Sequence, residues 1–270
     1  MNIPKIWSRK NSILLKELVK TDFKIRYQGS VLGYLWAVLR PMLLFAILYT
    51  VFAKILKMGG DIPHYSIYLM TGTVFWSFFS ECTGQGIQAI VGRSDLLRKI
   101  SFPKWIIVVS STITALINFL INLCVIIVFA LLNGVTPSFT WLLAPLVILE
   151  LYLLSLGIAF FLGSINVKYR DISSIWEVLM QALFYAVPII YPITMVSASS
   201  AVTAKVLLLN PIAQVIQDAR FLLITDQSIT VWNFIDNIFL RFIPVLITLF
   251  VLTIGSIYFR KHSKYFAEEA

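Results

Sequence analysis

The sequence has little charge and almost no cysteine. Only 13% of its 270 residues are charged, and its two cysteines, Cys82 and Cys124, lie in apolar runs. A soluble domain usually has about a quarter charged residues, so this chain has too few to cover a surface that faces only water. Two cysteines in apolar segments exclude a disulfide framework, and we expect them to be apolar filling that faces lipid or the core.

The sequence also lacks the residues of the common catalytic sites. No Gly-Lys dipeptide occurs, which excludes the phosphate-binding P-loop. The two histidines, His64 and His262, fall in a predicted loop and in the tail, where they form neither a metal cluster nor a catalytic triad. We therefore predict no catalytic residue, no metal and no cofactor in this chain. The N-terminal segment also lacks the apolar run and cleavage site of a signal peptide.

What the sequence has in excess is apolar residues, at 59% of the chain. A helix needs roughly 20 of them to cross a bilayer. Polar or glycine- and proline-containing interruptions at 54–64, 91–104, 133–140 and 166–171 separate the long runs. The fold class we predict is all-α, a polytopic membrane protein with six transmembrane helices. These spans are about 32–53, 65–90, 106–132, 141–165, 172–190 and 238–259.

Two regions are too polar to span. Residues 5–27 have an apolar stripe and spaced lysines, which is typical of an amphipathic helix in the membrane interface; a solvated helix packed on a partner remains the alternative. Residues 191–235 are apolar pieces broken by proline and charge, which predicts short surface or re-entrant helices. The predicted units are thus a cytoplasmic helix and elbow at 1–30, a transmembrane domain at 31–262 and a tail at 263–270.

The basic residues predict the orientation. The net charge is +9, and sixteen of the 22 Lys and Arg residues precede the first span, lie in segments 91–104 and 166–171, or follow the last span. Cytoplasmic loops are enriched in Lys and Arg, so we expect both termini in the cytoplasm. Because these charges flank apolar runs, they indicate topology signals and anionic-lipid contacts rather than nucleic-acid binding.

Charged and aromatic side chains within spans are candidates for a transport path. Carboxylates in a bilayer are costly; we assign Glu81 to a path, expect Glu150 to have a polar neighbour, and expect Glu177 to be solvated. The aromatic residues are read either as an interfacial belt or as a lining on which sugar rings slide. The candidate channel residues are Tyr49, Phe75, Trp76, Phe79, Glu81, Phe184, Tyr185 and Tyr191.

Five motifs occur in a fixed order along almost the whole chain. They are RYQGSVLGYLWAVLRPMLLFAILYTVF (26–52), DLLRKISFPKW (95–105), NVKYRDI (166–172), VPIIYP (187–192) and LNPIAQVIQDARFLL (209–223). Together they resemble the permease subunit of the ABC-2 family that exports cell-surface polysaccharides such as O-antigen, teichoic acid, rhamnose-rich wall polysaccharide and capsule.

The resemblance implies a homodimer in the bacterial cytoplasmic membrane, with each subunit docked on a separate ATPase that binds ATP and Mg. Its cargo would be a polyprenyl-pyrophosphate-linked glycan. By position, a coupling helix at about 94–103 and the loop after the fourth span contact the ATPase. The implied contact residues are Asp95, Leu96, Leu97, Arg98, Lys99, Ile100 and Phe102, with Lys168, Tyr169, Arg170 and Asp171.

The residues themselves support part of this assignment. Leu96, Leu97 and Ile100 form an apolar patch at helical spacing, which is unfavourable in the cytosol without a partner. Arg170 and Asp171 have an alternative role as caps of the fifth helix. Near the implied substrate entrance, Lys20, Lys24 and Arg26 would attract either a lipid-linked pyrophosphate or ordinary anionic phospholipids.

Two other functions stay open from the sequence. One is an ABC-2 exporter of drugs or lipids, which should have a closed apolar pocket. The other is a membrane glycosyltransferase acting on lipid-linked sugars, which would need catalytic charges on the outer face. Asp218, Arg220 and Asp226 are the only outer candidates, and we expect them to be helix-surface charges.

Overall fold

The computed structural model describes residues 9–28, 32–57, 62–100 and 102–266. Residues 1–8 and most of the predicted elbow, at 29–31, lie outside this description. So do residues 58–61 of the first predicted loop, Ser101 in the predicted coupling segment and residues 267–270 of the tail.

Within these ranges the chain is all-helical, as predicted, and contains no strand. The elements in chain order are α1 (Arg9–Tyr27), η1 (Gly33–Leu35), α2 (Trp36–Leu48), the π-helical η2 (Tyr49–Ile55), α3 (Tyr65–Gln88), η3 (Val91–Arg93), α4 (Ser94–Lys99), α5 (Trp105–Leu132), η4 (Phe139–Leu143), α6 (Ala144–Lys168), α7 (Ile172–Ala186), α8 (Ile193–Ser199), α9 (Ala201–Leu208), α10 (Pro211–Leu223), α11 (Val231–Phe234), α12 (Ile238–Arg241) and α13 (Ile243–His262).

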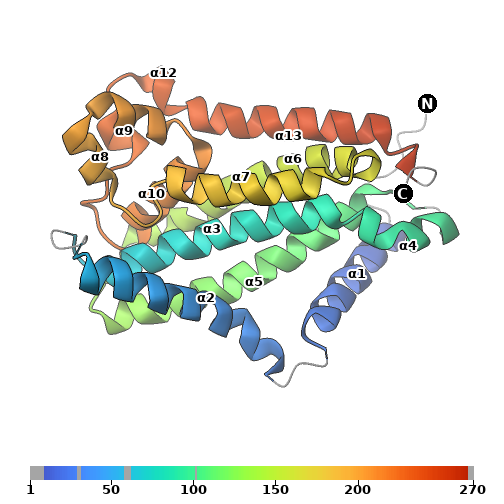
Figure 1. Cartoon of the computed structure of the whole chain (residues 1–270), viewed down its shortest axis with the longest axis horizontal. Helices are drawn as coiled ribbons and strands as arrows, with labels where there is room; N and C mark the ends of the chain where they lie inside the picture. The colour runs from blue at the N-terminus through green and yellow to red at the C-terminus, as the bar shows by residue number, and fades with distance from the viewer. Residues whose placement is uncertain (1–8, 29–31, 58–61, 101, 267–270) are drawn as a thin grey trace.

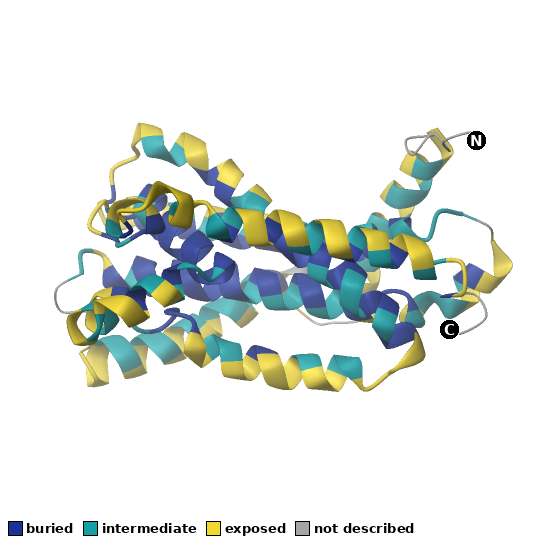
Figure 2. Ribbon diagram, turned by 90° about the horizontal axis from the view of Figure 1, so that it is seen from above, coloured by how far each residue is buried: buried dark blue, intermediate teal, exposed yellow. Residues whose placement is uncertain are grey.

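The long helices form one elongated bundle around α3 (Figure 1). This helix packs on α5 and α6 and also touches α2, α7 and α10. Most of its residues are buried, whereas α2 and α7 are largely exposed on the outside of the bundle (Figure 2). Since α3 contacts protein on most sides, it can carry polar residues that a lipid-facing helix cannot.

Segments predicted to share one side of the membrane gather at one end of the bundle. In Figure 1, α1, α4, the turn between α6 and α7 and the end of α13 lie at the same end. A hydrophobic cluster joins them, with Leu97, Val167 and Phe266 among its buried members. The short helices α8, α9 and α12 lie at the opposite end, where Ile193, Ala204 and Val231 form a separate cluster with their neighbours.

Each predicted span corresponds to a helix, but not all of these helices are equally apolar. In the described part of the chain, four segments are long and apolar enough to cross a membrane: Trp36–Ile55, Trp105–Leu132, Phe139–Lys168 and Ile243–His262; the bent pair Ala201–Leu208 and Pro211–Leu223 would make a fifth if taken as one span. The central helix α3 has 24 residues, about 36 Å, which is long enough to cross a membrane. Its mean hydropathy is lower than that of these four segments, so it does not count among them. The helix α7 is apolar but has only 15 residues.

Prolines account for two differences in boundary. The predicted fifth span was to end at Ile190, but α7 ends at Ala186, because the residue before a proline is driven from helical to extended backbone. Val187, which precedes Pro188, has φ −88° and ψ 141°. The last span was to begin at residue 238, but α13 begins at Ile243, with Pro244 in its first turn.

The prediction that Asp218 and Arg220 are surface charges was wrong. They lie on α10, which turns back at 95° after α9 and inserts among α3, α6 and α13. Asp218 is 6% exposed and Arg220 is 0% exposed. Asp226, beyond the end of α10, is exposed as expected. The segment 191–235 is therefore made of short helices, as predicted, and one of them, α10, is inserted into the bundle.

Arg220 compensates for the break after α7. Its guanidinium donates to the carbonyl oxygens of Pro188 (2.7 Å), Ile189 (2.6 Å) and Tyr68 (3.0 Å). These carbonyls lie within the bundle or beside a helix break, where unpaired carbonyls are costly. The guanidinium also lies 3.6 Å from the ring centroid of Tyr68. One side chain thus joins α3, α10 and the segment after α7.

The helices α6 and α13 cross closely, and this crossing depends on two glycines. A Cβ added to Gly255 would overlap the carbonyl oxygen of Gly157, and one added to Gly157 would lie 2.7 Å from the backbone of Leu252. Small residues at such crossings let helix backbones approach closely in membranes.

We expect Gly255→Ala to destabilise the protein by about 1–3 kcal/mol through overpacking, measured as a lower melting temperature in detergent. Gly84→Ala is the matched control, because a Cβ at Gly84 of α3 meets no atom within 4 Å. Equal melting temperatures for the two variants would contradict this account of the crossing.

Candidate functional site

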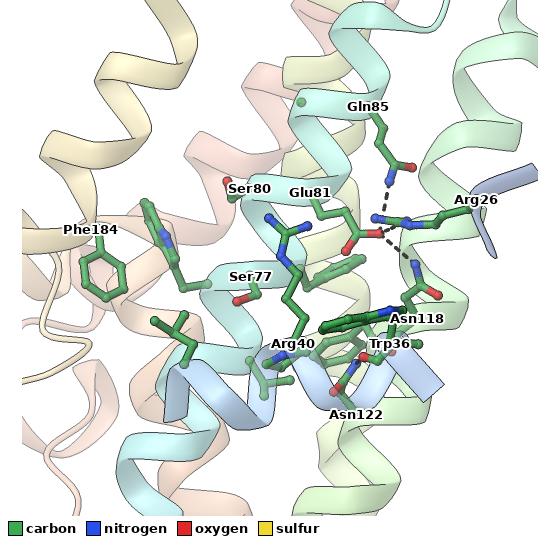
Figure 3. Close-up of a pocket in the computed structure, with 18 residues that line it drawn as sticks. Arg26, Trp36, Arg40, Ser77, Ser80, Glu81, Gln85, Asn118, Asn122 and Phe184 are labelled. Carbon is green, nitrogen blue, oxygen red and sulfur yellow. Dashed lines mark hydrogen bonds and ion pairs between the residues drawn. The ribbon is translucent and has the colours of Figure 1, made fainter. Parts of the chain in front are cut away.

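A cavity of about 1030 Å³ lies between α2, α3 and α5 (Figure 3). Its wall includes Phe184 of α7 and, at one end, Arg26 of α1. The polar lining residues are Arg26, Arg40, Ser77, Ser80, Glu81, Gln85, Asn118 and Asn122. The aromatic ones are Trp36, Trp76, Phe78, Phe119 and Phe184. The cavity is thus rich in polar groups although α2 and α5 are strongly apolar.

Glu81 is the centre of the polar contacts in this cavity. Its Oε1 pairs with the Arg26 guanidinium and accepts hydrogen bonds from Gln85 Nε2 (3.1 Å) and Asn118 Nδ2 (2.9 Å). These groups come from α1, α3 and α5, so the carboxylate connects three helices. Asn122, one turn after Asn118, donates to the Ala37 carbonyl of α2 at 3.0 Å.

Arg40 is the second cation of the cavity. It lies one turn into α2, and its side chain extends into the cavity toward the α3 face that carries Ser77, Ser80 and Glu81 (Figure 3). Trp36 lies one turn earlier on α2 and lines the same wall. The cavity therefore has two arginines and one carboxylate.

The predicted channel residues divide into three groups. Trp76, Glu81 and Phe184 line the cavity, and the rings of Trp76 and Phe184 lie 6.0 Å apart. Phe75 and Phe79 are each 1% exposed and belong to the core behind it.

The three predicted tyrosines lie outside the cavity. Tyr185 is 67% exposed beside Phe184, and Tyr49 stacks on Phe45. Tyr191 donates to the Ala186 carbonyl at 3.1 Å, and burial raises the pKa of its phenol. The aromatic residues of the sequence therefore could not be divided, from residue type alone, into those that line the cavity and those that pack in the core.

Sequence reasoning did not pick out the cavity's uncharged polar residues. The signal was their spacing: Ser77, Ser80 and Glu81 recur on one face of α3, and Asn118 and Asn122 are four apart in the otherwise apolar α5. Residues three or four apart share a helix face. Polar residues so arranged in apolar helices face the bundle interior or a cavity.

A smaller cavity of about 370 Å³ lies beside the first, between α1, α3 and α5. Arg26 and Gln85 line both cavities. In the smaller one, Asp22 of α1 pairs with Arg93, which also donates to Ser110 Oγ of α5 at 2.8 Å. The helix α1 is thus held by two ion pairs.

The other residues predicted to bind pyrophosphate or lipid headgroups, Lys20 and Lys24, are exposed on α1. Arg26 instead engages Glu81. The three predicted cations therefore do not form one cluster.

The predicted ATPase-coupling residues lie on two adjacent segments of one end of the bundle. Of the predicted apolar patch, Leu97 is 6% exposed and packs into the chain's own core, Leu96 is half-buried, and Ile100 is 53% exposed. Phe102 packs against the same core, while the remaining coupling residues of this segment are exposed: Asp95, Arg98 and Lys99. Only part of the patch is thus left for a partner.

The second predicted contact, the turn between α6 and α7, is exposed throughout. It comprises Lys168, Tyr169, Arg170 and Asp171. Asp171 occupies the N-cap position of α7, but its side chain accepts no capping hydrogen bond. Its location suits the positive end of the helix dipole, so its capping and contact roles are compatible.

A separate polar cluster surrounds α10. Gln214 donates to Asp218 (2.5 Å) and, weakly, to Glu150 of α6 (3.5 Å), and Trp232 donates to Asp218 at 3.1 Å. Glu150 therefore has a polar neighbour, as predicted. Within the described ranges, no group of three or more His, Cys, Asp or Glu side chains is arranged to hold a metal.

Comparisons with known proteins agree with this arrangement. The family model for the ABC-2 type transporter matches residues 13–224. An O-antigen export system permease protein, RfbA, of Myxococcus xanthus is 35% identical over 201 residues, covering 73% of this chain and 75% of its own. A protein of that name from Klebsiella pneumoniae is 28% identical over 260 residues, covering 94% of each chain. The polysialic acid transport protein KpsM of Escherichia coli is 21% identical over 217 residues, covering 77% of this chain and 80% of its own.

The contact between Arg26 and Glu81 makes a testable prediction. We expect Arg26→Gln and Glu81→Gln to be non-additive in the free energy of unfolding by about 1 kcal/mol, the upper range for a partly exposed ion pair. Thermal melts of the two single variants and the double variant measure this coupling. Lys24→Gln replaces Arg26→Gln in a control cycle, because Lys24 is exposed on the same helix; additive effects in both cycles would refute the pairing.

Proposed function

The chain belongs to the ABC-2 type transporter family, and we propose that it exports a lipid-linked cell-surface polysaccharide using ATP hydrolysed by a separate subunit. It is a multi-pass membrane protein and a transport subunit rather than an enzyme. The observation that carries the proposal is the polar, aromatic-edged cavity between α2, α3 and α5. Relatives named as O-antigen permeases and as a polysialic acid transport protein support the class of cargo.

The composition of the cavity favours a glycan over an apolar drug or lipid. Its amides, serine hydroxyls and Glu81 supply hydrogen bonds to sugar hydroxyls, while Trp76 and Phe184 offer faces to sugar rings. An apolar drug would leave these polar groups unpaired, which is costly in a low-dielectric site. The glycosyltransferase alternative loses support because Asp218 and Arg220 are buried rather than exposed on the outer face.

We place both termini and α4 on the cytoplasmic side, with six helices crossing the membrane: α2 with η2, α3, α5, α6, α7 and α13. The basic segments gather at the bundle end that carries α1, α4 and the turn between α6 and α7. The positive-inside rule supports this orientation. The short α7 is followed by the turn at residues 187–190, whose carbonyls are paired inside the protein.

The active unit we propose is a homodimer with two ATPase subunits. The lipid-exposed sides of α2 and α7 carry large apolar residues, among them Leu43, Ile47, Val178 and Tyr185. A second copy placed against these two helices would bring two cavities face to face. Together they would form a path wider than one subunit offers.

The structure suggests how an ATPase would act on the cavity. Exposed residues of α4 and of 168–171 offer the contact, and Arg93, directly before α4, pairs with Asp22 of α1. Arg26, one turn further along α1, pairs with Glu81 in the cavity. Movement of α4 would therefore pull on α1 and change the wall of the cavity. Coupling requires two conformations whose populations depend on the bound nucleotide, and the two positions of α1 would provide them.

The coupling surface is tested by Ile100→Glu. We expect this variant to lose co-purification with the ATPase subunit, because a charge would be placed in a desolvated contact. Val202→Glu is the control: Val202 is 72% exposed on α9, at the opposite end, and its variant should retain the ATPase. Normal recovery of the ATPase with Ile100→Glu would contradict the proposed contact.

The function itself is tested by deleting the gene and measuring surface polysaccharide. We expect the surface polymer to disappear and its lipid-linked form to accumulate inside, with recovery on complementation by this chain only when the ATPase is active. Unchanged surface polymer would refute the function. Export or glycan modification by the purified chain without an ATPase would favour the enzyme alternative.

A further inference from the structure

We infer that Arg40 binds the phosphate group of a lipid-linked ligand, at the edge of the cavity where α2 faces lipid. This inference rests on the proposed function and specifies which end of the substrate the cavity holds. It differs from the sequence-based assignment to Lys20, Lys24 and Arg26, because these are either exposed on α1 or engaged with Glu81.

The charges of the cavity are not balanced. Arg26 and Arg40 contribute two positive charges, and Glu81 contributes one negative charge that pairs with Arg26. Among the residues that the structure describes, none forms an ion pair or hydrogen bond with the side chain of Arg40. A cation within a membrane-spanning helix is costly unless it is paired. A bound anion would supply the charge that the described part of the chain does not.

The neighbours of Arg40 are also donors. The hydroxyls of Ser77 and Ser80 line the same cavity, as does the indole of Trp36. None of these three side chains makes a hydrogen bond to another described residue, so they are available to a ligand rich in acceptors. A guanidinium binds phosphate through two parallel hydrogen bonds. Phosphate oxygens, with several lone pairs each, match this set better than a neutral sugar does.

The location indicates that the phosphate is attached to a lipid. Arg40 lies one turn from the start of α2, beside Ser77 of α3 (Figure 3). Beyond it, Leu43, Leu44 and Ile47 are 54%, 41% and 61% exposed and continue along α2. An apolar chain can lie on this surface while its phosphate reaches Arg40. The first sugars would then lie deeper in the cavity, beside Glu81 and Asn118.

The test is binding to the complex of this chain with its ATPase in detergent, measured by titration with farnesyl diphosphate as a short polyprenyl diphosphate. We expect Arg40→Gln to weaken binding about tenfold or more, since a hydrogen-bonded charge pair is lost, and Arg40→Lys to restore part of it. Arg260→Gln is the matched control. Arg260 is an exposed arginine in the last turn of α13, away from the cavity, and its variant should bind as the unmodified complex does.

Two further probes separate the possible sources of the phosphate. Farnesol should show no dependence on Arg40, and inorganic pyrophosphate should bind much more weakly than farnesyl diphosphate. Pyrophosphate binding of equal strength and equal Arg40 dependence would overturn the lipid-linked assignment. Unchanged farnesyl diphosphate binding by Arg40→Gln would overturn the site.

These results are independent of the test of the proposed function. A failure at Arg40 leaves loss of surface polymer in the deletion strain intact. Continued export in that strain would instead refute the function while leaving Arg40-dependent binding of diphosphate lipid in place.

Discussion

Glu81, a carboxylate inside a bundle of apolar helices, is the group on which the rest of the cavity depends. A charge there is tolerated only with partners, and its partners come from α1, α3 and α5. This requirement holds the amphipathic α1 against the bundle and positions the amides of Gln85 and Asn118. It also explains why α3, most of whose residues are buried, is less apolar than the helices that face lipid. In a membrane protein the polar residues belong inside, and here they surround a cavity.

The same constraint governs the other end of the molecule. Pro188 ends α7 early, and the freed carbonyls are paired by Arg220 from the inserted helix α10. Because backbone groups at membrane depth must be satisfied within the protein, a broken helix needs such a donor. The break leaves residues 187–190 buried in the bundle. One end carries basic residues and the exposed segments predicted to contact an ATPase, and short helices lie at the other end.

The sequence predicted where the helices lie, but not which of their side chains are buried or line the cavity. Each predicted span corresponds to a helix, although only four of these described segments are long and apolar enough to cross a membrane, and proline and glycine located the interruptions. The boundaries at Ala186 and Ile243 differed from prediction because they depend on local proline geometry. The burial of Arg220 was missed because burial is decided by tertiary packing, and three carbonyl acceptors from distant segments leave no signal near position 220. In the same way, Trp76 and Phe75 are adjacent in sequence, yet only Trp76 lines the cavity. The spacing of polar residues on α3 and α5 was the better indicator, since lipid-embedded helices place such residues on the interior face.

The central claim is that the cavity between α2, α3 and α5 is part of the path of a polar cargo. The most direct measurement is the labelling rate of Ser77→Cys by a hydrophilic thiol reagent in inside-out vesicles, with Cys82 and Cys124 replaced by alanine. Ser77 lines the cavity, whereas Phe75, the control position, is 1% exposed. The account predicts rapid labelling of Ser77→Cys that is blocked when the lipid-linked glycan is present. Labelling as slow as at Phe75→Cys, with or without the glycan, would contradict it.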